Sequence, residues 1–168
     1  YDESQVCDML LQTTDGVIEE AAGLYVNGSL IGSVKNRADL SYILTGILDK
    51  VKEEEKASSS EFVESIQIVS GLYPTSRVMS SDELLDILNS ENSPVTVSYT
   101  REESYTEVID YKTRTVEDDS EYTDYSEVTQ QGEEGSRKVV DEVTYVDGKE
   151  TSRKNVSETV VEEPVDKI

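Results

Sequence analysis

The side chains of this chain that could do chemistry are carboxylates, tyrosines and amides. Aspartate and glutamate together number 37 and tyrosine numbers 10, whereas histidine is absent. Without histidine the chain cannot form a Ser-His-Asp triad, a Cys-His pair or a His-ligated zinc centre. Cys7 is the only cysteine, so an intrachain disulfide is excluded. A pair of carboxylates, as in glycosidases, is the catalytic arrangement that stays possible.

We nevertheless predict that the chain is not an enzyme and carries no cofactor. A carboxylate pair needs a cleft that excludes water, and the strand-rich second half described below favours an open sheet. Gly132 and Gly135 have the spacing Gly-x-x-Gly but lack the Lys-Ser/Thr pair of a phosphate-binding loop. These two glycines therefore indicate a turn.

Ligand binding is a second possible chemistry, in which an aromatic ring supports the ligand and nearby polar groups bond its hydroxyls. The candidates are tyrosines of the second half with a glutamate and a glutamine: Tyr105, Glu107, Tyr111, Tyr122, Tyr125, Gln130 and Tyr145. The alternative is that each tyrosine packs against a neighbouring strand, which is common in β-sheets. Both interpretations stay open at the level of sequence.

The formal net charge of −22 restricts the expected partners. Such a chain is repelled by phosphate backbones and anionic lipids, so nucleic acid is not an expected partner. No apolar stretch approaches the length of a membrane-spanning helix, so no membrane insertion is expected in this segment. The excess of acid favours solubility, and self-association through zinc or calcium is the alternative. The carboxylates that could bridge chains in this way are Glu117, Asp118, Asp119 and Glu121. We assign no metal site, because carboxylate-only ligands are uncommon for zinc.

The first half, residues 1–92, is predicted to be an α+β domain made of a hairpin, a helix, a strand and a second helix. Asn27-Gly28 is typical of a type I′ turn, whose two central residues have positive φ. The pairs expected across this hairpin are Tyr25 with Leu30 and Leu24 with Ile31.

Apolar spacing predicts the other elements of this half. A helical stripe is formed by Leu40, Ile43, Leu44, Ile47, Leu48 and Val51. The segment KEEEKASSSE after this stripe is predicted to be a polar linker, and residues 61–69 alternate as in one strand of the same sheet. Ser80 and Glu83 have the spacing of a capping box before a short helix. Val6, Met9 and Leu10 suggest a further amphipathic helix.

The second half, residues 93–168, is predicted to be all-β. Leucine, methionine and phenylalanine are absent from it, so it has few side chains for a packed core. Thr, Val and Tyr alternate without a continuous apolar face, and Asp147-Gly148 marks a tight hairpin. We expect an elongated, largely single-layer sheet that is wetted on both sides and held by cross-strand pairs.

Several spaced motifs of this half resemble the five-glycine (G-five) domain. They are YTEVIDYKT, VTQQGEEG and VTYVDGKETSRKNVSETVVEEPVDKI, and they cover residues 98–168. The sequence departs from the family pattern at Asp110, where a proline is usual. Only Gly132, Gly135 and Gly148 remain of the glycines. The resemblance implies a non-catalytic module that binds N-acetylglucosamine-containing polymers such as peptidoglycan, or a purely structural or metal-dependent, self-associating stalk.

The first half more loosely resembles the region that precedes LysM and G-five modules in exported clostridial proteins with lysostaphin-like zinc peptidase domains. The motifs that carry this resemblance are LYVNGSLIGSVKN, EFVESIQIV and GLYPTSRVMSSDELLDIL. It implies a cell-wall or surface location in a Gram-positive bacterium. It also implies a peptidase downstream, which the present module would position.

Overall fold

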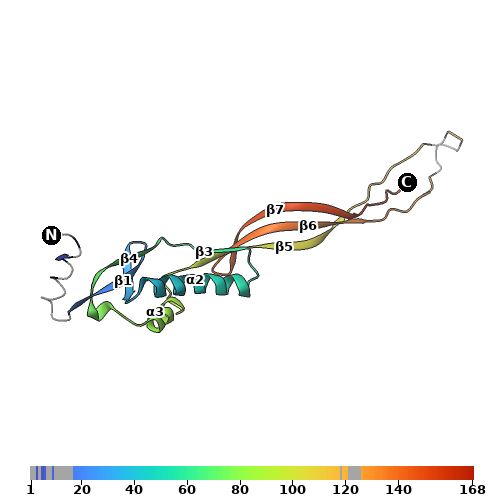
Figure 1. Cartoon of the computed structure of the whole chain (residues 1–168). Coiled ribbons are helices and arrows are strands. Elements are labelled where there is room, and N and C mark those ends of the chain that lie inside the picture. The colour runs from blue at the N-terminus through green and yellow to red at the C-terminus, as the bar shows by residue number, and fades with distance from the viewer. Residues whose placement is uncertain (1–2, 4, 7–8, 10–16, 118, 121–125) are drawn as a thin grey trace. The chain divides into compact units, whose positions relative to one another are not determined.

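The computed structural model describes residues 1–168 except 1–2, 4, 7–8, 10–16, 118 and 121–125 (Figure 1). The chain forms two compact units, one of residues 1–100 with 145–149 and one of residues 101–144 with 150–168. The predicted boundary between residues 92 and 93 stays a prediction. The helix predicted around Val6, Met9 and Leu10 falls on a segment that lies largely outside the described residues.

The first unit contains a three-stranded antiparallel sheet with the order β2-β1-β4. Its strands are β1 (Ile18–Val26), β2 (Ser29–Val34) and β4 (Ile66–Pro74). Asn27 and Gly28 have φ values of 49° and 80°, which confirms the predicted type I′ turn.

The register of this hairpin confirms one predicted pair and corrects the other. Tyr25 lies opposite Leu30 as predicted, but Leu24 lies opposite Gly32 and not Ile31. The register shifts between Leu24 and Tyr25, because an extra residue of β2 is accommodated there as a bulge. Turn chemistry alone does not reveal such an insertion.

Two helices and the strands β1 and β2 supply most of the apolar core of this unit. Helix α2 (Arg37–Glu54) and helix α3 (Ser81–Leu88) match the predicted helices. The Ser80 Oγ accepts a hydrogen bond from the Glu83 N–H over 3.2 Å, and the Glu83 carboxylate accepts one from the Ser80 N–H over 2.8 Å, so the predicted capping box is present. The buried core consists of Ala22, Leu24, Val26, Val34, Leu40, Ile43, Leu44, Leu84, Leu88 and Val95.

The prediction of one strand over residues 61–69 is wrong. The segment divides between β3 (Ser59–Phe62) and β4, which belong to different sheets. The residues between them bond in two directions: the Val63 N–H donates to Thr96 O over 2.9 Å, and the Ser65 N–H donates to Asn27 Oδ1 over 3.0 Å. The predicted linker also begins and ends in regular structure, because α2 extends to Glu54 and β3 begins at Ser59. The alternation of side chains over residues 61–69 continues from β3 into β4. This pattern therefore could not reveal that the chain passes from one sheet to another between them.

The second unit is a single layer of strands (Figure 1). It contains most of β5 (Val97–Ile109), β6 (Gly135–Val146) and β7 (Lys149–Glu162), in the order β5-β6-β7. The first residues of β5 belong to the first unit, where they pair with β3, Phe62 lying opposite Val97. All 14 residues of β7 are exposed. The predicted combination of an α+β part and an all-β, single-layer part is therefore confirmed.

One face of the central strand corrects the expectation of a sheet wetted on both sides. Val139, Asp141 and Val143 are only 2%, 3% and 0% exposed. These alternate residues share one face of β6. The layer is single, yet it has a dry strip along this face.

The final residues of the chain form a ladder with two earlier segments of the second unit. Thr113 bridges Lys167 in parallel, and Glu133 bridges Val165 in antiparallel orientation. The backbone N–H groups of Glu133 and Val165 each donate to the other's carbonyl oxygen over 2.9 Å. The tail, residues 163–168, thus bonds to segments on both of its sides.

Candidate functional site

The polar face of β5, β6 and β7 is centred on Asp141, which is almost fully buried. Its carboxylate accepts three hydrogen bonds of 3.1 Å, from the Tyr105 hydroxyl, from Nη1 of Arg153 and from Nδ2 of Asn155. Burial tends to raise the pKa of Asp141, but the bonds from Arg153, Tyr105 and Asn155 outweigh it and lower that pKa. Asp141 therefore stays ionised and joins all three strands.

Arg153 on β7 extends this network. Its Nη2 donates to Glu150 Oε2 over 2.8 Å and to Glu103 Oε2 over 3.1 Å, in addition to the bond to Asp141. Hydrogen bonds from Arg153 to Glu150, then Asp141 and Glu103, raise the pKa of the guanidinium. Two of these three carboxylates, Asp141 and Glu103, belong to other strands, so their bonds to the fork-shaped cation hold the edge strand to the rest of the sheet.

A second cluster repeats this arrangement further along the strands. Arg137 on β6 donates from Nε and Nη2 to Glu107 Oε2 over 3.0 and 2.7 Å, and from Nη1 to Glu158 Oε2 over 2.9 Å. Its pKa is raised, chiefly by the hydrogen bond to Glu107. Glu107, a predicted sugar ligand, is thus engaged in binding a neighbouring strand.

The charged side chains also explain how a single layer can bury valines. Val139 lies between Arg137 and Asp141 on the same face of β6. The arginine side chains on this face are 39% and 37% exposed for Arg137 and Arg153. Long side chains can cover apolar surface with their alkyl stems while the charged ends stay in water. Arginine stems held in place by these ion pairs are suited to covering such an apolar strip.

The predicted tyrosines have different environments. Tyr105 is 42% exposed on this face, and partial burial together with the Asp141 carboxylate raises the pKa of its hydroxyl. Tyr145 belongs to the first unit, where its ring stacks on Tyr99 with centroids 5.2 Å apart and planes 16° apart. Tyr122 and Tyr125 lie outside the described residues.

Tyr111 and Gln130 lie near the tail. A Cβ added to Gly132 would meet the ring of Tyr111, 2.6 Å from its Cγ, so the glycine makes room for the tyrosine. The Gln130 side chain donates to Asp166 O over 2.7 Å. Gly135 has a similar role, because an added Cβ would lie 2.6 Å from Pro164 N and would also strike Glu162 O. Both glycines are places of close chain approach, not of positive φ.

Of the predicted site residues that the structure describes, only Tyr105 and Glu107 are brought to the charged face. The sequence analysis missed Glu103, Arg137, Asp141 and Arg153, which organise it. The role of Asp141 could have been predicted from the sequence. Asp141 stands between Val139 and Val143 at the spacing of one strand face, and a carboxylate buried in such a position requires a partner. The partners themselves come from other strands.

The other places where a site could form are a cavity, the acidic side chains and the helices. A cavity of about 540 Å³ lies in the first unit and is open to solvent, and the carboxylates that line it are Glu54, Glu55, Glu91 and Asp147. Within the described residues, no three carboxylates or cysteines gather in a way that could hold a metal ion. Of the possible bridging carboxylates, Glu117 and Asp119 are exposed, and Asp118 and Glu121 lie outside the described residues. The helices of the described part are too short or too polar to cross a bilayer.

Comparison with known proteins gives a family match for the second half of the chain. None of the curated proteins compared with the chain matches it. Residues 100–168 match the G5 domain family, the five-glycine family that the sequence motifs resemble, and members of this family are often cell-wall-associated modules. The segment from Thr100 to Ile168, which supplies the charged face and the tail ladder, contains a G5 domain.

Proposed function

We propose that this chain is a non-catalytic module of an exported bacterial protein and that its G5 domain binds cell-wall glycan through the face around Tyr105. The observation that carries the proposal is a tyrosine ring, 42% exposed, held among hydrogen-bonded charged groups on a single-layer sheet. An exposed ring can support a sugar, and nearby charged groups can bond its hydroxyls. N-acetylglucosamine-containing peptidoglycan is the proposed ligand.

Rigidity of the face favours binding. The Tyr105 hydroxyl is held by Asp141, which Arg153 and Asn155 hold in turn. A ring that is already oriented loses little conformational freedom when a ligand binds. Each flanking carboxylate also keeps lone pairs that could accept bonds from sugar hydroxyls.

The same contacts argue against glycoside hydrolysis. A general acid must carry a proton near neutral pH, which requires a raised pKa. Asp141 has a lowered pKa, and Glu103 and Glu107 are paired with guanidinium groups 3.1 and 2.7 Å away. Carboxylates held in this way are suited to fixing strands and binding hydroxyls, not to donating protons.

Co-sedimentation with insoluble peptidoglycan tests the proposal. The wild-type chain should sediment with the wall material, and Tyr105→Leu should reduce the bound fraction several-fold while the circular dichroism spectrum stays unchanged. Tyr42→Leu is the matched control, because Tyr42 is 82% exposed on α2, and it should bind as the wild type does. Retention no greater than that of an unrelated acidic protein would refute glycan binding.

A structural spacer is the second candidate, and the exposure of every residue of β7 favours it. A single-layer sheet spans a greater length with the same number of residues than a domain that folds around a core. This property is suited to a stalk. Small-angle scattering should then give a radius of gyration well above the roughly 15 Å of a compact chain of this size. A value near that figure would exclude the spacer.

The parent protein is proposed to act outside the cell, at the wall or surface of a Gram-positive bacterium. In that setting the module would position a downstream zinc peptidase, as the resemblance of the first half implies. The complete reading frame tests this directly: a zinc-peptidase signature after Ile168 would support it, and a parent without one would refute it.

A further inference from the structure

The outer edge of β7 is a long strand edge with no neighbouring strand among the described residues. β7 is the last strand in the order β3-β5-β6-β7, and each of its 14 residues is exposed. Such an edge presents unpaired backbone N–H and C=O groups that can pair with another strand. Val156, Val160 and Val161 add apolar surface here, with exposures of 53%, 47% and 68%.

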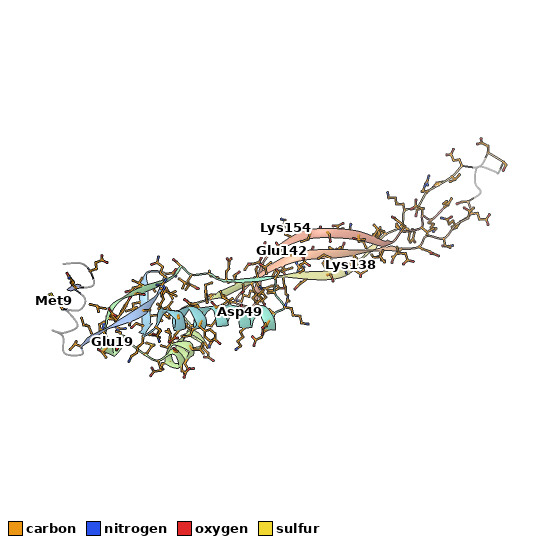
Figure 2. The ribbon with its side chains drawn as sticks, in the orientation of Figure 1. Met9, Glu19, Asp49, Lys138, Glu142 and Lys154 are labelled. Atoms are coloured by element: carbon orange, nitrogen blue, oxygen red, sulfur yellow. The ribbon has the colours of Figure 1, made fainter. Side chains whose placement is uncertain are left out.

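The charges of β7 are separated by sign along its length. Between Glu150 and Glu162, the basic residues Arg153 and Lys154 stand before Val156, and the acidic residue Glu158 stands after it. Two copies of such a strand are complementary when they run antiparallel. Figure 2 shows Lys154 on β7, and it makes no ion pair with any residue of the described part.

We propose that β7 pairs antiparallel with β7 of a second copy of the chain, around a two-fold axis at Val156. Val156 then faces its own counterpart, and Lys154 of each copy lies opposite Glu158 of the other. Opposite charges in directly facing positions stabilise an antiparallel pair. A self-complementary strand of this kind produces a closed, isologous dimer.

The remaining pairs of this register are compatible with the contacts within one copy. Ser152 faces Val160 and Thr151 faces Val161, so two exposed valines gain cover. Glu150 faces Glu162, the one like-charge pair between these two positions. Glu150 is already bound by Arg153, whose hydrogen bond lowers the pKa of Glu150. Glu158 has one oxygen on Arg137 and keeps the other for Lys154.

This pairing does not depend on glycan binding or on a metal ion. The polar face around Tyr105 stays on the surface of the sheet, whereas the pairing uses the edge. No three potential metal ligands gather among the residues that the structure describes, so main-chain hydrogen bonds and the Lys154–Glu158 pairs supply the interaction.

Sedimentation equilibrium of the full chain in the presence of EDTA tests the proposal. The wild type should associate reversibly from 18.7 kDa to twice that mass. Lys154→Glu should remove association, because it places two acids opposite each other at both ends of the pair. The double variant Lys154→Glu with Glu158→Lys restores the opposite charges and should recover the dimer.

Lys138→Glu is the control for charge alone. Lys138 is exposed on β6, an inner strand (Figure 2), so its reversal should leave the dimer intact. The proposal is overturned if the wild type stays monomeric at millimolar concentration, if EDTA abolishes the dimer, or if Lys138→Glu weakens it as much as Lys154→Glu does. Failure of the double variant to recover association would also overturn the stated register. Peptidoglycan binding is measured separately and is unaffected by these outcomes.

Discussion

The Tyr105 hydroxyl lies 3.1 Å from Oδ2 of Asp141, and this bond links β5 to the most buried carboxylate among the described residues of the G5 domain. The same carboxylate receives Arg153 and Asn155 from β7. One side chain of the central strand thus joins both neighbouring strands. In a sheet with no second layer, such a cross-strand network replaces much of what an apolar core provides.

Asp141→Asn should lower the melting temperature of the G5 domain near pH 7 and reduce its acid sensitivity. The folded pKa of Asp141 is lowered, so the stabilisation is complete above the ordinary carboxyl value of about 3.9 and is lost as the pH falls through the lower folded value. Thermal unfolding between pH 2 and pH 7 measures both effects. Glu142→Gln, an exposed change on the other face of β6, is the control and should leave the curve unchanged. Equal acid profiles for Asp141→Asn and the wild type would contradict the assigned role.

Gly135→Ala should destabilise the chain by about 1–3 kcal/mol, because the added Cβ meets the backbone of Glu162 and Pro164. Gly46→Ala makes the same change in α2, where no atom lies within 4 Å of the added Cβ. It should stabilise the chain by about 0.5–1 kcal/mol through helix propensity. Urea unfolding of the two variants checks the opposite signs, and a Gly135→Ala variant as stable as the wild type would show that the tail does not pack against this glycine.

Gly148→Val should destabilise the β6–β7 hairpin by more than about 1 kcal/mol. Gly148 has φ of 69°, a conformation that β-branched residues rarely adopt, and no atom lies within 4 Å of an added Cβ. The cost is therefore conformational and not steric crowding by neighbours. Gly148→Asn, which tolerates this region better, should cost much less in the same denaturation experiment. Equal stabilities of the two variants would contradict this explanation.

Ser80→Ala should destabilise the first unit by about 1 kcal/mol, because it removes the side-chain acceptor for the Glu83 N–H at the start of α3. Ser41→Ala is the matched change within α2, and it should be neutral or slightly stabilising, since alanine favours the helix interior. Chemical denaturation followed by circular dichroism separates the two. A neutral Ser80→Ala would mean that α3 is held by Leu84 and Leu88 alone.

Local chemistry made several elements predictable. The Asn27-Gly28 and Asp147-Gly148 turns, the stripe of α2 and the Ser80–Glu83 box depend on residues close together in sequence, and each is present in the structure. The prediction of one strand over residues 61–69 is wrong because the alternation of apolar and polar residues does not depend on which sheet each half joins. The bulge opposite Leu24 was missed for a similar reason, since it depends on how two strands meet.

The sequence by itself determined that the second half has too few large apolar residues for a two-layer core, and therefore that its strands form a single layer. Only the tertiary structure decided which charges hold that layer together, because Glu103, Asp141 and Arg153 come from three different strands and their pairing depends on register. It also decided that Gly132 and Gly135 serve close packing, of Tyr111 and of the tail around Pro164. A glycine's neighbours in space are set by chain segments far away in sequence, which composition and spacing do not encode.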